Sequence, residues 1–551
     1  MIKKRVLTIL LTISIAVPVF AATPVEKVSS ADESSQFNSI SLARGYKNLS
    51  DTNPCITQKF SADPCAMEYN GRVYVYSTND GEASSWVGQN NDYGKITQLN
   101  CMSSSDMVNW TDHGTINAAG RYGAAKWAGN SWAPTACHKK INGKEKFFLY
   151  FANSSNGIGV LTSDSPTGPW IDPIGRPLIS RSTPNCDSRS VEWLFDPAVL
   201  VDSDGTGYLY FGGGVPRGQD ANPRTARVIK LGNDMTSIVG VPTTLNVPYL
   251  FEDSGINKVG NTYYYSYCNS WSKGAKIAYM TSNSPMGPFA YKGTCLDNPG
   301  VFFGTTGNNH HSIVSLKGRS YIVYHSEWLN KQMYGSQKGY RTTNINEISI
   351  GNGYISNVRG NLTGVSQVEN VNPYLLNQAE SIAWQGGIKV TGQGDTKVEM
   401  NRGDWIGVSN VDFGTGASSI SMRAASVNGG VIKVCTDSPS GTAIGYVRVP
   451  RTGSNNNFTN VTANISNVYG TKKLFFVSSA DVVIDSWQFF KNGSNADPNP
   501  TPEPNPQPQP QPTTSVSDGW YYIKNVNAQK YLQVSGNVGK AVQNVEKRCI
   551  I

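Results

Sequence analysis

Charged residues are scarce in this chain of 551 residues. Asp, Glu, Lys and Arg make up 16% of it, below the quarter or so that is usual in globular proteins, and this argues against coiled coils and helical arrays. The net charge is +8, and Lys3, Lys4 and Arg5 supply three of these charges. The other basic residues are spread along the sequence without a cluster, so we expect no nucleic-acid partner.

Cysteine is also sparse. The nine Cys residues are scattered and include no CxxC pair, which excludes a disulfide-dense scaffold and the common zinc motifs. A bridge such as Cys55 to Cys65 is an option outside the cell, but spacing fixes no connectivity. Serine and cysteine nucleophiles are disfavoured, because no GxSxG elbow precedes a helix and no cysteine has a suitable His and Asn arrangement.

Long hydrophobic runs are missing except at the N-terminus. After the basic start, an apolar run extends from Val6 to Phe20, is interrupted by Pro18, and ends near Ala21. This pattern predicts a signal peptide over residues 1–21. The run is shorter than the roughly 20 residues that span a bilayer, so we expect a secreted, extracellular monomer with no membrane association after cleavage.

Glycine and aromatic residues are plentiful, with 55 Gly, 27 Tyr and 12 Trp. Glycine allows tight turns and aromatics pack well on pleated surfaces, so this composition predicts an all-β fold. Proline takes every second position from Pro498 to Pro512, which indicates a semi-rigid linker over residues 493–515. The sequence DGWYYIKNVNAQKYLQVSG then resembles the opening of a ricin-type lectin module. Residues 516–551 are too few for a whole domain, so we expect a partial β-trefoil.

A turn followed by an aromatic-rich strand occurs five times at intervals of about 60 residues. The copies are NGRVYVYSTN, NGKEKFFLYFAN, DGTGYLYFGG, GNTYYYSYCN and KGRSYIVYHSE. Each interval accommodates a four-stranded sheet with its loops. The repeats therefore predict a five-bladed β-propeller over residues 40–365. A pair of β-sandwiches with accidental similarity is the alternative.

A short polar or aromatic element precedes each repeated strand. Equivalent positions of successive blades converge on the central axis of a propeller, so we expect these side chains to meet in one cavity. Carboxylates that share a cavity repel one another, which keeps one protonated while another stays ionised. Glycoside hydrolysis needs such an acid and base. The elements are Asp63-Pro64, Trp132-Ala133-Pro134, Asp196-Pro197, Glu252-Asp253-Ser254 and His310-His311.

The segments FSADPCAMEYNGRVYVY, SWAP, LFDPAVLVDSDGTGYLYFGG, LFEDSGINKVGNTYYYSY, GNNHHSIV and GYRTTNINEI resemble glycoside hydrolase family 43. The resemblance implies an inverting enzyme in which Asp63 is the general base, Glu252 the general acid, and Asp196 the residue that orients Glu252 and tunes its pKa. It also implies that Arg341 contacts substrate and base.

Trp132 and His310 allow two interpretations each. Trp132 stacks on the sugar or shapes the pocket wall, and the alternative is that SWAP is only a rigid strand entry, because Pro stiffens the backbone and Trp packs well. The resemblance implies that His310 holds a calcium ion at the propeller centre, and a hydrogen-bonded core histidine is the alternative. His325 and Glu327, inside the fifth repeated strand, are interpreted as structural residues.

Residues 372–492 show alternating apolar positions with frequent turns, which predicts a β-sandwich (jelly-roll) module. The region resembles a family 6 carbohydrate-binding module, and this implies a structural calcium held by Glu380 and Asp485, whose oxygens suit that ion. Val483, Phe458 and Val408 stand where the family's sugar cleft carries Asn and aromatic residues. We therefore expect weak sugar binding there, while a sheet-face site or a structural role stays open.

These features together predict a secreted hydrolase that removes α-L-arabinofuranosyl units from arabinoxylan or a related plant cell-wall polysaccharide. A β-xylosidase or an arabinanase of the same family is the alternative. A non-catalytic carbohydrate-binding propeller is an alternative of another class, although such a protein would not need three carboxylates at equivalent blade positions.

Overall fold

The computed structural model describes residues 30–83, 89–491, 524–525 and 530–531. The chain divides into two units, one up to Pro502 and one from Glu503 onward. The expected signal peptide and nearly all of the expected linker and partial β-trefoil lie outside the described residues. In the second unit, the short strands β34 (Lys524–Asn525) and β35 (Lys530–Tyr531) pair in antiparallel fashion.

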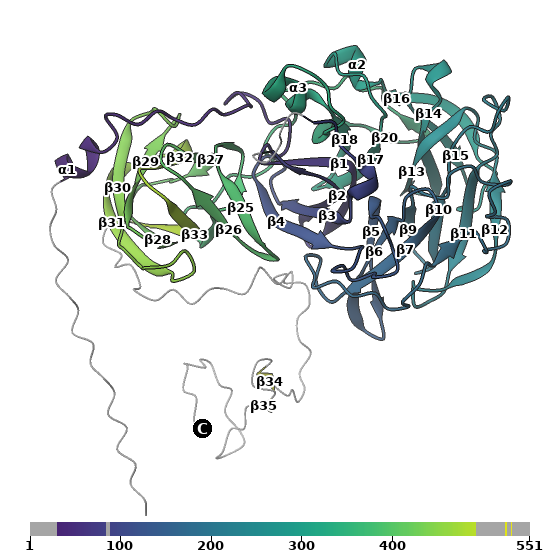
Figure 1. Ribbon diagram of the computed structural model, residues 1–551, viewed down its shortest axis with the longest axis horizontal. Helices are drawn as coiled ribbons and strands as arrows, with labels where there is room; N and C mark the ends of the chain where they lie inside the picture. Colours follow the sequence, from purple (N-terminus) through teal and green to yellow (C-terminus); the bar gives the residue numbers. More distant parts are fainter. Residues whose placement is uncertain (1–29, 84–88, 492–523, 526–529, 532–551) are drawn as a thin grey trace, which may run out of the picture. The chain divides into compact units, whose positions relative to one another are not determined.

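The first part of the larger unit is a ring of five antiparallel sheets (Figure 1). The five-bladed propeller predicted from the repeats is therefore confirmed. The first blade pairs β1 (Lys59–Tyr69), β2 (Arg72–Glu82), β3 (Gln98–Ser104) and β4 (Trp110–Asn117). The second and third contain β5 (Trp132–Ile141), β6 (Lys144–Ala152), β7 (Gly157–Ser163), β8 (Ile179–Ser180), and β9 (Ala198–Val201), β10 (Gly207–Phe211), β11 (Ala226–Leu231), β12 (Ile238–Leu245). The fourth and fifth contain β13 (Leu250–Val259), β14 (Thr262–Asn269), β15 (Ile277–Ser282), β16 (Ala290–Leu296), and β17 (His311–Leu316), β18 (Arg319–Ser326), β19 (Thr342–Ile348).

The five repeated segments form the second strand of each blade, namely β2, β6, β10, β14 and β18. The turn before β2 shows why the repeat begins with Asn-Gly, because Asn70 and Gly71 both have a positive φ, at 51° and 73°, as a tight hairpin turn requires. Each repeated strand then places a fully buried tyrosine between neighbouring blades. These tyrosines are Tyr76, Tyr150, Tyr210, Tyr264 and Tyr324.

The residues just before β1 close the ring. The Asn53 side chain donates to Ile345 O and accepts from Ile345 N–H, each at 2.8 Å. The Cys55 N–H also donates to Thr343 O at 2.9 Å. The chain that enters the first blade is therefore held along β19 of the last blade.

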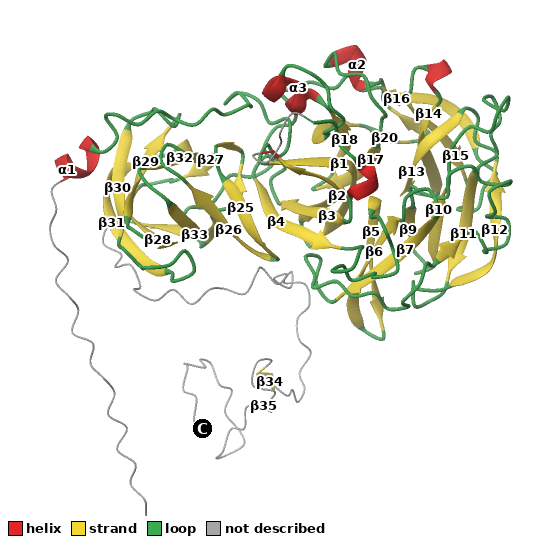
Figure 2. Cartoon of the chain, viewed as in Figure 1, coloured by secondary structure: helices red, strands yellow, loops and turns green. Residues whose placement is uncertain are grey.

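Helices are short; α1 precedes the first strand by a long loop, and the others lie between strands (Figure 2). They are α1 (Ser30–Ser35), α2 (Pro299–Phe302), α3 (Trp328–Tyr334) and the 3-10 turns η2 (Tyr93–Lys95) and η3 (Trp271–Lys273). The minor strands β20 (Ile350–Gly351) and β21 (Tyr354–Ile355) form a hairpin after β19. Among the described residues, no helix has the length and apolar character needed to cross a membrane. The eight cysteines in this part of the chain are unpaired.

A β-sandwich follows the propeller, as the sequence predicts. Its first sheet contains β22 (Asn377–Gln378), β25 (Lys389–Gln393), β26 (Asp395–Met400), β33 (Val482–Phe490), β28 (Ala417–Ala425) and β31 (Thr459–Val468). Its second sheet contains β30 (Ala443–Val449), β29 (Gly430–Thr436), β32 (Thr471–Ser478), β27 (Trp405–Asp412) and β24 (Trp384–Gly386).

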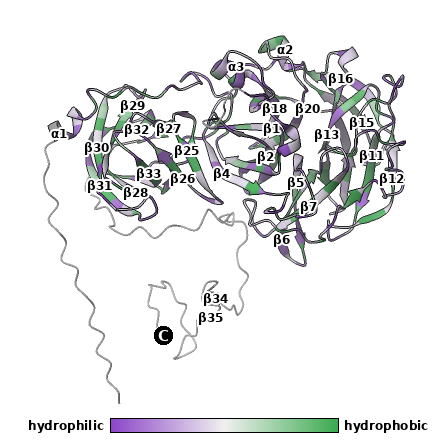
Figure 3. Ribbon diagram, viewed as in Figure 1, coloured by the Kyte–Doolittle hydropathy of each residue, from purple (hydrophilic) through white to green (hydrophobic). Residues whose placement is uncertain are grey.

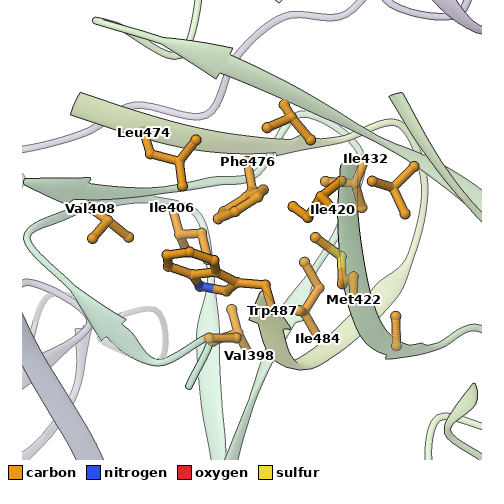
Figure 4. Close-up of a cluster of buried hydrophobic side chains, with 14 of the residues drawn as sticks. Val398, Ile406, Val408, Ile420, Met422, Ile432, Leu474, Phe476, Ile484 and Trp487 are labelled. Atoms are coloured by element: carbon orange, nitrogen blue, oxygen red, sulfur yellow. The ribbon is translucent and has the colours of Figure 1, made fainter. Parts of the chain in front are cut away.

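The core of the sandwich is built from the inward-facing residues of both sheets. Trp487 and Ile484 come from one sheet, and Ile406, Leu474 and Phe476 come from the other (Figure 4). The rings of Phe476 and Trp487 lie 5.5 Å apart. Burying these apolar side chains on facing sheets is what holds the two layers together.

The sandwich and the first blade share a second core. Trp110 of β4 belongs to the same buried cluster as Trp384, Trp405 and Phe475 of the sandwich. The short strand β23 (Ser381–Ile382) pairs with β4, and Gln393 of β25 also pairs with it. Figure 3 shows hydrophobic residues concentrated along the strands of both parts. The sandwich therefore extends the outer edge of the first blade.

Candidate active site

Four inner strands begin with the same backbone distortion. One residue in each of these segments adopts a left-handed conformation, with φ between 40° and 67°. It stands directly before Pro64, Pro134, Pro197 or Ser254. Register shifts mark this position in the first, second and fourth blades. A bulge of this kind redirects side chains near the end of a strand. The four left-handed residues are Asp63, Ala133, Asp196 and Asp253.

These strand ends surround a cavity of about 300 Å³. The structure brings six of the eight predicted site residues together there, from all five blades. They are Asp63, Trp132, Asp196, Glu252, His310 and Arg341. The other two predicted residues, Glu380 and Asp485, belong to the sandwich.

Asp63 is buried and surrounded by donors. Arg341 Nη1 lies 2.8 Å from its Oδ1, and Thr78 Oγ1 donates to its Oδ2 at 2.7 Å. Burial opposes ionisation, but the Arg341 charge outweighs it, with help from His325 and His310, and holds the pKa of Asp63 well below its usual range. Asp63 is therefore ionised across the physiological pH range.

Arg341 is fixed by Asp80, a residue that the sequence analysis does not identify. The Asp80 carboxylate accepts from Arg341 Nε and Nη2, each at 2.9 Å, and from the Arg341 backbone N–H at 3.0 Å. Such a fork-to-carboxylate pair fixes the plane of the guanidinium. Asp80 thus leaves Nη1 of Arg341 directed at Asp63.

Glu252 has the opposite environment. Its Oε1 is buried and has no hydrogen-bond partner among the described residues. Burial, followed by the charges of Asp196, Asp63 and Asp253, raises the pKa of Glu252 well above its ordinary value. Burial and the charge of Asp63 also raise the pKa of Asp196, whose Oδ2 accepts the Asp253 N–H at 2.9 Å. The same pocket therefore favours the ionised form of Asp63 and the protonated form of Glu252.

His310 lies at the centre of the carboxylates. Its Nδ1 is 3.7 Å from Asp63 and 3.8 Å from Asp196, and its Nε2 is 3.2 Å from Asp253 Oδ1. Burial lowers the pKa of His310 against the pull of Asp253 and Asp63. The Asp253 carboxylate also meets His311 Nδ1 at 2.5 Å.

We tested whether these donors suit calcium, which prefers six to eight oxygen ligands. Asp253 Oδ1 is buried without a hydrogen-bond partner in the described part of the chain, and a cation beside it would satisfy that oxygen. No group of three His, Cys, Asp or Glu side chains within the described ranges forms a metal site. The side chains at His310 therefore supply only part of a calcium coordination shell.

His325, interpreted from the sequence as structural, touches the predicted base. Its Nδ1 accepts the Asp63 backbone N–H at 3.0 Å, and its Nε2 is 2.9 Å from Asn308 O. An Nδ1 that accepts this N–H leaves Nε2 as the nitrogen that donates to Asn308 O. The histidine therefore holds the backbone of Asp63 in place. Glu327 lies directly before α3, where its Oε2 accepts the Gly339 N–H at 2.8 Å.

Aromatic rings form the pocket walls. Trp132 Nε1 donates to Tyr93 O at 2.9 Å, which fixes the indole as part of the wall. The Arg341 guanidinium carbon lies 4.7 Å from the Tyr93 ring centroid. Tyr93, Trp193 and Phe195 line the same cavity. Sequence patterns do not single out these three residues, because each lies outside the repeated strands and carries no signal beyond its aromatic ring. Asp253 belongs to a predicted element, but its contacts with His310 and His311 are not predicted.

In the sandwich, only one of the two carboxylate oxygens of Glu380 has a hydrogen-bond partner among the described residues. Its Oε1 accepts from Thr396 Oγ1 at 3.1 Å, while its Oε2 is buried and lacks a partner among the described residues. Burial, with the charges of Asp485 and Asp112, raises the pKa of Glu380 well above its usual value. Asp485 pairs with Arg423 Nη1 at 2.9 Å. A cation therefore suits Glu380, while Asp485 already has a positive partner.

The residues expected at the sugar cleft of the sandwich do not form aromatic walls. Val408 and Val483 are 1% and 4% exposed. The Phe458 ring is covered by cations, with Arg423 at 4.7 Å and Lys397 at 5.2 Å from its centroid. A sugar ring has no bare aromatic surface at these positions.

Comparison with known proteins agrees with this geometry. Residues 52–355 match the model of glycosyl hydrolases family 43, and residues 378–491 match that of carbohydrate binding module family 6. An arabinoxylan arabinofuranohydrolase of Bacillus subtilis is 48% identical over 479 residues, which is 80% of this chain and 93% of the relative. A protein of the same name from Paenibacillus polymyxa is 46% identical over 476 residues, covering 80% of this chain and 75% of that one.

A crystal structure of a family 43 arabinoxylan arabinofuranohydrolase from Bacillus subtilis, in complex with cellotetraose, superposes with a TM-score of 0.77 at 46% identity. The match covers 81% of this chain and 99% of that chain. A fold match of this extent spans both the propeller and the sandwich. The chain belongs to glycosyl hydrolase family 43 and carries a family 6 carbohydrate-binding module.

Proposed function

We propose that this glycoside hydrolase removes α-L-arabinofuranosyl units from arabinoxylan with inversion of the anomeric centre. The observation that carries the proposal is the contrast between Asp63 and Glu252, two carboxyl groups of one pocket whose pKa values are shifted in opposite directions. The names of the two relatives that align along most of this chain support the substrate.

In the proposed reaction, Asp63 acts as the general base. Its ionised carboxylate takes a proton from a water molecule, and the water oxygen attacks the anomeric carbon as the glycosidic bond breaks. Arg341 keeps Asp63 ionised through its Nη1 contact. The His325 contact to the Asp63 N–H keeps the carboxylate directed into the pocket.

Glu252 acts as the general acid. Its carboxyl group donates a proton to the departing glycosidic oxygen, so that the leaving sugar departs as an alcohol. The charge of Asp196 favours the protonated form of Glu252, and the Asp253 N–H fixes Asp196 beside it. Asp196 therefore positions and tunes the acid. After the reaction Asp63 carries the proton and Glu252 is ionised, so proton exchange with solvent resets the site.

Calcium is a second part of the proposal. Glu380, with its orphaned buried oxygen, and Asp485 would hold a structural ion in the sandwich, while His310 and the unpartnered Oδ1 of Asp253 would contact one at the propeller centre. Such an ion would stabilise the fold by neutralising buried carboxylates. The N-terminal residues 1–21 support secretion. Secretion and a monomeric state stay predictions.

Product analysis tests the proposed function. The protein is incubated with arabinoxylan, debranched xylo-oligosaccharides and arabinan, and the released sugars are separated by anion-exchange chromatography. We expect arabinose from arabinoxylan as the main product, and loss of that product in Asp63→Asn. Xylose from the xylo-oligosaccharides as the main product would instead identify a β-xylosidase, and arabino-oligosaccharides from arabinan an arabinanase. Binding of a polysaccharide without release of any sugar would identify a non-catalytic carbohydrate-binding protein.

A further inference from the structure

A run of aromatic side chains leads out of the active-site pocket. Trp193 and Phe195 line the pocket, and their ring centroids are 5.4 Å apart. Trp193 also contacts Phe251 at 5.1 Å, and Phe251 lies 6.3 Å from Trp271, both in edge-to-face geometry. Aromatic pairs attract one another over about 4.5–7 Å. The run is therefore continuous from the pocket wall to Trp271.

The run ends in solvent. Phe195 is 8% exposed, whereas Trp271 is 49% exposed. In the described ranges, Trp271 is the only tryptophan that is exposed to this degree. Tryptophan is highly buried on average, and an exposed aromatic that adjoins a binding pocket indicates a contact surface.

Trp271 lies at the same end of the fourth blade as the predicted acid. Strand pairing matches Leu250 with Asn269 and Glu252 with Cys268. The turn that carries Trp271 begins directly after Asn269. The start of β13, which carries Glu252, and this turn therefore lie side by side at the edge of the pocket.

The turn is held in one conformation. The Ser270 N–H donates to Tyr249 O at 2.7 Å, and the Gly274 N–H donates to Trp271 O at 3.1 Å. Gly274 has a φ of 91°, which a glycine adopts without strain. Lys273 Nζ lies 4.2 Å from the Tyr249 ring centroid. A turn that is ordered before binding loses little entropy when a ligand arrives.

The pocket itself is small. A volume of about 300 Å³ is at the lower end for ligand sites, so it suits the sugar to be cleaved and one neighbour. The rest of a polysaccharide must lie outside the pocket. Apolar C–H faces of pyranose rings pack on flat aromatic surfaces, because both surfaces lose contact with water.

We propose that Trp271 is a platform on which a main-chain sugar of the polysaccharide stacks outside the pocket. The proposal rests on the proposed function and adds a specificity-determining contact to it. Phe251 packs against the Trp271 ring and Trp193 packs against Phe251, so both hold Trp271 in place. Trp271 itself contacts the sugar. The platform favours polymeric substrates over small glycosides, which end before they reach it.

The test compares Trp271→Ala with Tyr291→Ala. Tyr291 is 52% exposed on β16 of the same blade, so its loss controls for removal of an exposed ring. Steady-state kinetics are measured with arabinoxylan and with an aryl α-L-arabinofuranoside. We expect kcat/KM for arabinoxylan to fall roughly tenfold more than kcat/KM for the aryl substrate in Trp271→Ala, mainly through KM. Trp271→Phe should restore most of this loss, and Tyr291→Ala should leave the ratio unchanged.

Two results would overturn the proposal while leaving the proposed function intact. One is an unchanged ratio in Trp271→Ala, and the other is an equal loss on both substrates, which would indicate structural support of the pocket. Binding can be measured separately by electrophoresis in gels that contain arabinoxylan, with Glu252→Gln as the parent protein. The polysaccharide should slow the migration of the Glu252→Gln protein more than that of the Glu252→Gln, Trp271→Ala protein. A wild-type protein that releases no arabinose from either substrate would instead overturn the proposed function.

Discussion

Arg341 Nη1 lies 2.8 Å from Asp63 Oδ1, while Asp80 holds Nε and Nη2 of the same guanidinium at 2.9 Å. One buried cation is thus shared between two buried carboxylates. Because its orientation is fixed by Asp80, its stabilising effect on ionisation reaches Asp63 directly. Glu252 has no such partner among the described residues, and its raised pKa favours the protonated form. This asymmetry supports the proposed roles of Asp63 as base and Glu252 as acid.

Replacing Glu252 by Gln removes the proton donor but preserves the shape of the side chain. We expect the rate of arabinose release from arabinoxylan to fall by roughly 10²–10⁴-fold. The loss should be smaller for an aryl arabinofuranoside with an acidic leaving group, because that group departs with little protonic help. Glu347→Gln, which changes an exposed ion pair with Arg319, is the matched control and should retain activity. Equal losses on both substrates would contradict the acid role.

The pH dependence of kcat/KM should report both carboxyl groups. The proposed mechanism requires ionised Asp63 and protonated Glu252. It should therefore persist at pH values below the usual range for Asp, and fall on the alkaline side as pH rises through the elevated pKa of Glu252. In Arg341→Gln the pKa of Asp63 rises, so the acid limb should move to higher pH. Arg319→Gln is the surface control. An acid limb that does not move would show that Arg341 does not keep Asp63 ionised.

The shared core predicts that the propeller and the sandwich unfold together. Phe475 is fully buried with its ring centroid 6.1 Å from that of Trp384 and 6.0 Å from that of Trp405. Phe475→Ala should lower the free energy of unfolding by about 3–5 kcal/mol. The denaturant midpoints for loss of sandwich structure and for loss of activity should fall by the same amount. Tyr469→Ala, at a 51% exposed position, should have little effect. Loss of sandwich structure at a denaturant concentration where the propeller stays active would contradict this prediction.

Calcium should raise the melting temperature. Removal of calcium by a chelator should destabilise the protein, because Glu380 would again be a buried carboxyl group with an unsatisfied oxygen. Glu380→Gln should reduce this calcium dependence, and Glu399→Gln in the neighbouring strand β26 is the control. Scanning calorimetry with and without calcium measures both effects. A melting temperature independent of calcium in the wild-type protein would exclude a structural ion.

The sequence predicts the propeller well because each blade is built from local hairpins. Asn70-Gly71 and its counterparts determine where strands turn, and the buried tyrosines repeat with them. Asp63 and Asp196 are recognisable because each precedes a proline at the start of an inner strand. Glu252-Asp253-Ser254 lacks this proline and is recognisable only by its place before the repeated strand. The sequence does not indicate that Asp253, not Glu252, takes the left-handed position in that blade.

Other site residues depend on ring closure. Asp80 and Arg341 are separated by 261 positions, and His325 contacts Asp63 across a similar interval. Such pairs have no local pattern, since they meet only when the last blade closes against the first. The shared core of Trp110 and Phe475 likewise cannot be predicted from the sequence, because the local pattern around each residue indicates only the core of its own domain.

The stereochemistry of the first product tests the central claim most directly. Proton NMR is recorded in the first minutes after enzyme is added to arabinoxylan, before the released sugar mutarotates. The account predicts that free arabinose appears first as the β-anomer, because a water activated by Asp63 attacks opposite the α-linkage. Arabinose that appears first as the α-anomer would indicate a covalent intermediate, and would contradict the assignment of Asp63 as general base.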